Sequence, residues 1–127
     1  MEGARNELSA TTISLIERAA TRSSLLVSAI SVWEVAMLEA KGRITLSRSI
    51  QEWVSEALTV TGMKLVELSP AIAMESAKLP GEPHGDPADR IIMATARLLG
   101  ATLITRDARI LAYGATGHLR AYNGLAR

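Results

Sequence analysis

Apolar positions along this chain form helical stripes, which are separated by short, continuous apolar runs. Spacings of three and four residues predict a helix after Ser9 and further helices over residues 31–41, 50–58, 70–78, 86–99 and 107–114. Short apolar or alternating runs predict strands over residues 25–27, 63–68, 101–105 and 118–122. Because strands and helices alternate, the pattern predicts an α/β fold with a mostly parallel sheet.

Several of the predicted helices carry recognisable start and stop residues. Asp86-Pro87 suits a helix start, because Asp caps the free backbone N–H groups and Pro fits the first turn. Gly100 and Gly114 are the expected ends of the last two helices, since glycine readily adopts the left-handed conformation found there. We expect the most apolar elements to be largely buried, namely the 86–99 helix and the strands over 25–27 and 101–105.

Composition narrows the class of protein. The chain has 127 residues, which fits a single domain over residues 1–127, and 48% of them are hydrophobic. Cysteine is absent, which excludes disulfides and thiolate metal ligands and fits a cytoplasmic protein. No apolar run approaches the roughly 20 residues that a membrane-spanning helix needs. The net charge of +1 does not by itself indicate a nucleic-acid partner.

Three acidic residues lie near the starts of predicted helices, and two of these helices directly follow predicted strands. Glu34 follows the first strand, Asp107 follows the third directly, and Asp89 lies in the first turn of the helix that we expect to be the most buried. In open parallel sheets, ligands bind outside the carboxyl ends of the strands. Connectivity places Glu34 and Asp107 there, and Asp89 joins them if its helix begins at the same crevice.

Each acid also has a purely structural interpretation. Ser31 and Glu34 fit a capping box, Asp86 and Asp89 fit an ordinary helix start, and Asp107 could cap the helix after it. Acids at helix starts are also favoured by the helix dipole. Position alone therefore leaves structural and functional roles open.

Clustered carboxylates would favour a particular chemistry. They repel one another unless a cation is present, and all-oxygen ligands suit Mg²⁺ or Mn²⁺. Such an ion can bind a phosphate oxygen and activate a water.

Arg90 and Arg106 flank the acids and could contact phosphates, although pairing with the acids is an equal alternative. His84 lies in a Gly/Pro-rich loop, where a solvated histidine is the simpler interpretation, and Trp33 and Trp53 suit core or interface positions.

Three segments together resemble the acidic motifs of PIN domains of the VapC type. They are SAISVWE at residues 28–34, HGDPADRIIMATA at 84–96 and TLITRD at 102–107, and the second is the most specific. The resemblance covers nearly the whole chain. It implies a PIN-like three-layer α/β/α sandwich with a mostly parallel sheet. It also implies Mg²⁺- or Mn²⁺-dependent hydrolysis of RNA by a toxin of a type II toxin–antitoxin pair.

The resemblance also assigns roles to individual residues. Glu34, Asp89 and Asp107 match the catalytic, metal-binding acids, Asp86 matches an accessory metal-binding acid, and Thr105 matches a small polar residue beside the site. Members of this branch are held inactive by a small antitoxin protein of the VapB type and commonly form homodimers. The expected partners are therefore RNA, such an antitoxin and a second copy of the chain.

One departure from the family pattern concerns the start of the chain. The family opens with an apolar strand that lies in the middle of the sheet and ends in an aspartate ligand, whereas residues 1–9 contain no match. A misassigned start codon, a truncated gene or a strand supplied by another chain would each explain the difference. We expect weak or no nuclease activity from these 127 residues. The alternative is a non-catalytic PIN-like module that binds an antitoxin-like protein or RNA.

Overall fold

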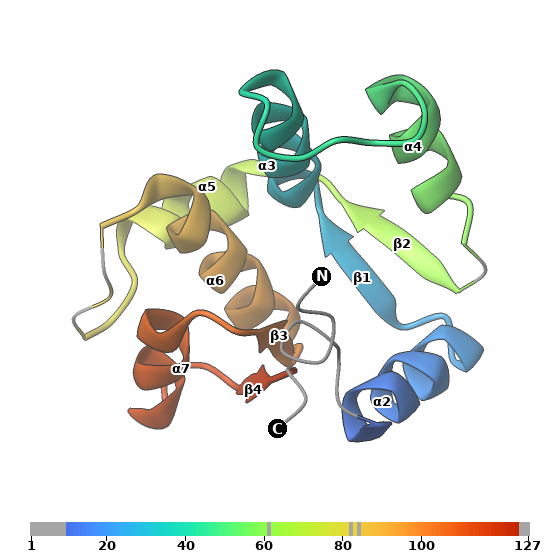
Figure 1. Ribbon diagram of the computed structural model, residues 1–127. Coiled ribbons are helices and arrows are strands. Elements are labelled where there is room, and N and C mark those ends of the chain that lie inside the picture. The colour runs from blue at the N-terminus through green and yellow to red at the C-terminus, as the bar shows by residue number, and fades with distance from the viewer. Residues whose placement is uncertain (1–9, 61, 82, 84, 125–127) are drawn as a thin grey trace.

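The computed structural model describes residues 10–60, 62–81, 83 and 85–124, which form an alternating α/β fold (Figure 1). The expectation that Ser9 caps the first helix falls outside these residues. The predicted alternation of helices and strands is confirmed. The elements are α2 (Ala10–Thr21), β1 (Leu25–Ser28), α3 (Ala29–Ala40), α4 (Ile50–Ala57), β2 (Met63–Val66), α5 (Pro70–Ala77), α6 (Pro87–Leu99), β3 (Leu103–Thr105), α7 (Ala108–Ala115) and β4 (Ala121–Asn123).

The strands form two separate parallel pairs rather than one continuous sheet. β1 pairs with β2, with Leu25 opposite Met63, and β3 pairs with β4, with Leu103 opposite Ala121. No strand of the described residues joins β1 to β3. The parallel pairing agrees with the predicted fold class.

The facing edges of β1 and β3 can be identified from their hydrogen bonds. The Leu25 N–H donates to the Gly62 carbonyl at 3.3 Å, and the Leu103 N–H donates to the Arg120 carbonyl at 2.9 Å. Because successive peptide groups of a strand point to opposite sides, the neighbouring residues direct their peptide groups away from β2 and β4. These residues are Leu26 and Ser28 on β1, Thr102 immediately before β3, and Ile104 on β3.

A gap lined mainly by apolar side chains lies between these two edges, and we call it the slot. On the side of α6 it holds a cavity of about 220 Å³ lined by all four of those edge residues. On the side of α2 it holds a cavity of about 570 Å³, where Leu15 and Ala19 face Leu26, Thr102 and Ile104. The slot therefore has helices over both faces, as the interior of a parallel sheet does.

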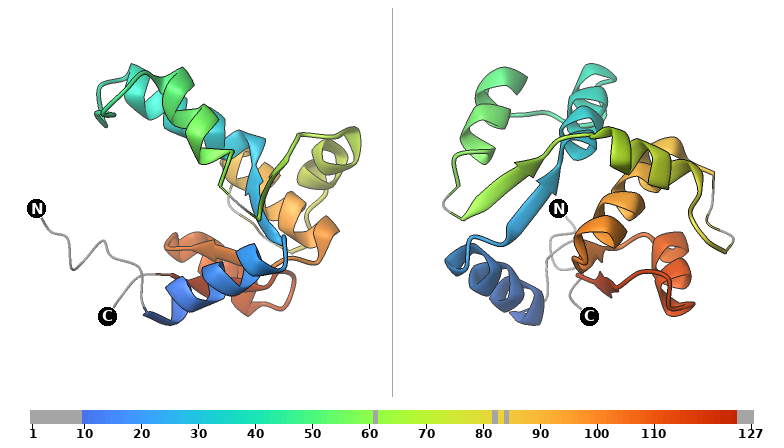
Figure 2. Two further views of the ribbon diagram at one scale, coloured as in Figure 1. Left: turned by 90° about the vertical axis from the view of Figure 1, so that its right-hand side faces the viewer. Right: turned by 180° about the vertical axis from the view of Figure 1, so that it is seen from behind.

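The buried core lies in the C-terminal part of the described chain. Met93 and Ala94 on α6 are completely buried, and Arg97 on the same helix contacts Glu75 of α5. The two further views show α6 lying beside α5 and α7 (Figure 2). The core cluster consists of Ile72, Leu79, Met93, Ala94, Ala96, Ile110, Tyr113 and Leu119.

The predicted boundaries of α6 are confirmed. The Asp86 carboxylate accepts a hydrogen bond from the Asp89 N–H at 3.1 Å, Pro87 occupies the first turn, and Gly100 ends the helix at φ 63°. The prediction for α7 is wrong at its end, because this helix continues through Gly114 to Ala115. A Cβ at Gly114 would lie 2.9 Å from the Ala121 Cβ, so a glycine is needed there for β4 to pack closely.

The expectation of extensive burial is also wrong in part. Leu26 on β1 is 39% exposed, and Leu98 and Leu99 on α6 are 46% and 50% exposed. Leu26 and Leu99 line the slot, and nothing in the described chain covers them there.

Among the described residues, no helix has the length and apolar character needed to cross a membrane.

Candidate active site

Glu34 lies deeper in its helix than the sequence suggested. Ser28, the last residue of β1, caps α3 by accepting a hydrogen bond from the Ile30 N–H at 3.1 Å. The strand thus runs directly into the helix, and the predicted capping box between Ser31 and Glu34 does not form. Glu34 lies in the second turn and is not needed to cap α3, which weakens its structural interpretation.

Glu34 shares an acidic environment with the start of α6. α3 packs against α6, and the Glu34 side chain is half-buried. Burial raises the pKa of Glu34 above its usual value, and the negative charges of Asp89 and Asp86 raise it further. The structure therefore brings these acids from two helices into one neighbourhood, which we call the acid pocket.

Asp86 and Asp89 are placed by the start of α6. The carboxylate of Asp86 is the exposed N-cap, so this residue has the structural role that its sequence position allowed. Asp89 follows in the first turn and is half-buried. The positive end of the helix dipole and the nearby backbone N–H groups favour negative charge at both positions.

Asp107 occupies the start of α7, directly after β3. Its carboxylate accepts hydrogen bonds from the Arg109 N–H at 2.8 Å and the Ile110 N–H at 3.2 Å, so it caps this helix. The Thr105 hydroxyl accepts a hydrogen bond from the Asp107 N–H at 3.0 Å and fixes the turn between strand and helix. Both side chains are therefore held in position by local contacts.

Asp107 is less closely associated with the acid pocket than Asp86 and Asp89 are. It is not among the charges that shift the pKa of Glu34. Within the described part of the chain, no three His, Asp or Glu side chains converge closely enough to hold one metal ion. The described residues thus bring acids from α3 and α6 together, with Asp107 as a further acid at the start of α7. They do not form a complete set of metal ligands.

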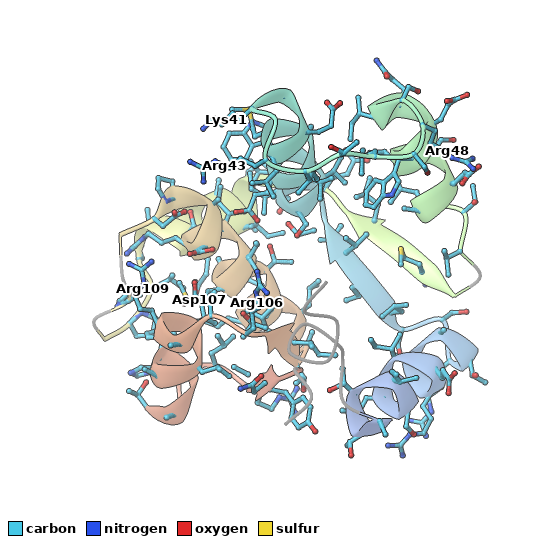
Figure 3. All side chains as sticks on the ribbon, viewed as in Figure 1. Lys41, Arg43, Arg48, Arg106, Asp107 and Arg109 are labelled. Atoms are coloured by element: carbon cyan, nitrogen blue, oxygen red, sulfur yellow. The ribbon has the colours of Figure 1, made fainter. Side chains whose placement is uncertain are left out.

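The two arginines named from the sequence differ in their surroundings. The Arg90 Nε donates to the Ser76 carbonyl at 2.9 Å and is partly buried, which ties α6 to α5. Arg106 is exposed and lies beside Asp107 at the start of α7 (Figure 3). Arg106 is therefore the more exposed of the two arginines.

Sequence reasoning did not single out three further cations close to these elements. Arg109 follows Asp107 by two residues, and Lys41 and Arg43 lie just after the end of α3, the helix that carries Glu34 (Figure 3). Their closeness in sequence to the elements that carry the acids is the signal that could have identified them.

The donor chemistry of the acid pocket suits a hard divalent cation. Its side chains offer only carboxylate oxygens, which Mg²⁺ and Mn²⁺ favour. Burial is the main cause of the raised pKa of Glu34, and the negative charges of Asp89 and Asp86 add to it, as expected for carboxylates that lack a neutralising charge. The pocket fits a metal by charge and ligand type, while the described residues supply fewer converging ligands than a complete site needs.

Comparison with known proteins identifies the family. Residues 4–115 match the PIN domain family. The chain is 37% identical over 86 residues to ribonuclease VapC22 of Mycobacterium tuberculosis (strain ATCC 25618 / H37Rv). That match covers 68% of this chain and 65% of the relative, so the chain aligns with just under two thirds of that protein.

A solved structure shares the fold. The crystal structure of VapBC2 from Rickettsia felis, bound to a DNA fragment from its promoter, superposes with a TM-score of 0.63. The superposition covers 88% of this chain and 83% of that chain at 17% sequence identity. The chain belongs to the PIN domain family, in its VapC-type branch.

Proposed function

We propose that the chain derives from a metal-dependent endoribonuclease toxin of a type II toxin–antitoxin pair. The observation that carries this proposal is that α3 packs against α6, which places Glu34 in the second turn of α3 within the electrostatic influence of Asp89 in the first turn of α6. The similarity to a VapC ribonuclease gives the substrate class. RNA is therefore the proposed substrate, and phosphodiester hydrolysis is the proposed reaction.

Each residue has a defined part in this proposal. Glu34 and Asp89 hold a Mg²⁺ or Mn²⁺ ion, with Asp107 as a further catalytic ligand and Asp86 as an accessory acid. When bound, the ion supplies an activated water and stabilises negative charge on the phosphate. Thr105 positions the backbone beside Asp107, while Arg106 and Arg90 lie near the path of the substrate.

Metal binding and the protonation of Glu34 are linked in this scheme. A raised pKa means that the carboxyl keeps its proton to a higher pH than an ordinary glutamate does. A bound cation favours the carboxylate form and displaces that proton. Metal affinity should therefore fall as the pH is lowered through the acidic range.

The proposed partners are a small VapB-type antitoxin and a second copy of the chain, in the cytoplasm. The structural relative is a VapBC complex, which supports an antitoxin partner. Trp33 on α3 is 52% exposed, and such large aromatic side chains are common at protein interfaces. The helices that carry Trp33 and Trp53 are accordingly the proposed interaction surface.

A second candidate is a PIN-like module that binds RNA or an antitoxin-like protein without catalysis. The specific observation in its favour is that the described residues do not bring three acidic ligands together. A binding module of this kind would need no metal ion.

Cleavage of a structured RNA, assayed with Mg²⁺, Mn²⁺ or EDTA, tests the proposal. We expect slow cleavage that requires metal and is lost in Glu34→Gln and Asp89→Asn. Glu39→Gln is a matched control, because it removes a carboxylate from the same helix as Glu34. Cleavage that persists in EDTA, or that is equal in all variants, would contradict the metal-dependent mechanism. No cleavage by the wild-type chain at any metal concentration would favour the binding module.

A further inference from the structure

Two groups of cations lie on the elements that flank α6. The view with side chains shows Lys41 and Arg43 at the end of α3, and Arg106 and Arg109 at the start of α7, with α6 between these two helices (Figure 3). All four side chains are exposed. Because Asp86 and Asp89 mark the start of α6, the acid pocket lies between the two groups.

The α3 group is held in place by the backbone. The Gly42 N–H donates to the Glu39 carbonyl at 3.0 Å, and the Arg43 N–H donates to the Leu38 carbonyl at 2.9 Å, which gives the helix a fixed end. Gly42 adopts the positive φ of 72° that this turn requires. Lys41 and Arg43 therefore project from a defined position rather than from a variable loop.

The distance between this group and the acid pocket follows from helix geometry. At a rise of roughly 1.5 Å per residue, Lys41 lies about 10 Å along α3 from Glu34. Neighbouring phosphates of one duplex strand are about 3.4 Å apart along the axis, so this separation corresponds to a few nucleotides. One nucleic-acid strand can therefore reach both the acid pocket and the end of α3.

The α7 group is fixed equally well. The Arg109 N–H donates to the Asp107 carboxylate, so the backbone at Arg109 is ordered by the helix cap. Arg106 precedes Asp107, and the two arginines therefore flank the acid on α7.

Other arginines of the chain already serve structural contacts. Arg97 binds the Glu75 carboxylate at 2.8 Å, and Arg48 pairs with Glu56. Within the described residues, no ion pair is made by Lys41, Arg43 or Arg109. Their positive charges are available to a ligand.

We propose that these cations hold the phosphates of one RNA strand on either side of the acid pocket, with Lys41 and Arg43 on one side and Arg109 on the other. The inference rests on the proposed nuclease function. An acid pocket repels a polyanion, and the chain's net charge of +1 offers little general attraction. Cations on both sides offset that repulsion and leave the phosphate between them facing the carboxylates.

Fluorescence anisotropy of a labelled single-stranded RNA in EDTA tests this assignment without cleavage. The variants are the double change Lys41→Ala with Arg43→Ala, and the single change Arg109→Ala. We expect affinity at low salt to fall on the order of tenfold for the double variant. The slope of log affinity against log salt should become shallower by about 0.7 for each phosphate that the variant no longer neutralises.

Matched controls separate these effects from loss of fold or of net charge. Arg18→Ala with Arg22→Ala removes the same charge from α2 and the turn that follows it. This control should weaken RNA binding by no more than about twofold, the effect of net charge alone. Arg43→Lys keeps the charge and should bind nearly as wild type does. Mn²⁺ binding should be unchanged in all these variants, so a failure of the metal site and a failure of RNA holding give different results.

Equal loss of affinity in the α2 control and the Lys41/Arg43 variant would overturn the proposal, because net charge alone would then account for binding. Competition by polyglutamate as effective as competition by unlabelled RNA would also overturn it. That result would assign the cations to an acidic protein segment instead.

Discussion

The two parts of the molecule that flank the slot differ in how completely they are packed. In the C-terminal part, α5, α6 and α7 enclose Met93 and Ala94, which have no exposed surface. In the N-terminal part, among the described residues of α2, β1, α3, α4 and β2, only Thr12 is fully buried, while Leu26, Leu65 and Trp33 are substantially exposed. Among the described residues β1 has a strand neighbour on only one edge, so its other edge is left open at the slot. The acid pocket lies where α3 of the first part packs against α6 of the second.

The largest expected effect contrasts one side chain from each part. Met93→Ala should lower the free energy of unfolding by about 2–5 kcal/mol, because it leaves a cavity in a closely packed core. Leu26→Ala should cost less than about 1 kcal/mol, since its side chain is already 39% exposed. Urea unfolding of both variants measures the difference. A cost for Leu26→Ala that equals the cost for Met93→Ala would show that the slot is filled in solution.

A second contrast uses the two ion pairs. Arg97 is about three-quarters buried, binds Glu75 and also donates to the His118 carbonyl, so Arg97→Met should destabilise the fold by about 2–3 kcal/mol. Arg48 and Glu56 are 45% and 64% exposed, so Arg48→Met should change stability by less than about 0.5 kcal/mol. Thermal unfolding at low and high salt checks both values. An equal loss for the two variants would contradict the difference in packing.

A third prediction concerns individual backbone amides along the slot. The N–H groups of Leu25 and Leu103 are bonded to neighbouring strands, whereas those of Leu26 and Ile104 point into the slot. Hydrogen exchange followed by NMR should therefore show slow exchange at the first pair and faster exchange at the second. Equal protection at all four amides would mean that a further strand occupies the slot.

The smallest expected effect is the pH dependence of stability at Glu34. The folded state raises the pKa of this carboxyl, so folding is favoured by its protonation and the benefit is lost as the pH rises through the folded pKa. Without metal, Glu34→Gln should raise the melting temperature slightly at neutral pH, and the difference should vanish below pH about 4. With Mn²⁺ present, the wild type should have the higher melting temperature, because the ion stabilises only the protein that retains the Glu34 carboxylate. A pH-independent difference between the two proteins would contradict the cause assigned to the shift.

Local signals in the sequence were sufficient for much of the fold. Asp86, Pro87 and Gly100 define both ends of α6, because capping depends on residues close together in the chain. The prediction of a capping box at Ser31 is wrong because the local sequence offers more than one possible cap. Several serines compete at that position, and the end of β1 selects Ser28, which the spacing of residues alone does not reveal.

Features that depend on distant neighbours were less accessible to sequence reasoning. The exposure of Leu98 and Leu99 reflects what lies next to α6 and not the apolar character of the helix itself. The approach of Glu34 to Asp89 was expected only from the usual arrangement of parallel sheets. The cations at Lys41, Arg43 and Arg109 became candidates only once their helices were placed on either side of α6.

Titration of the wild-type chain and of Asp89→Asn with Mn²⁺ at neutral pH tests the central claim most directly. The account predicts a Mn²⁺ site in the wild type whose affinity falls roughly tenfold or more in the variant, because a carboxylate ligand has been removed. Equal Mn²⁺ affinity in the two proteins would contradict the account, since the acid pocket would then not be a metal-binding site.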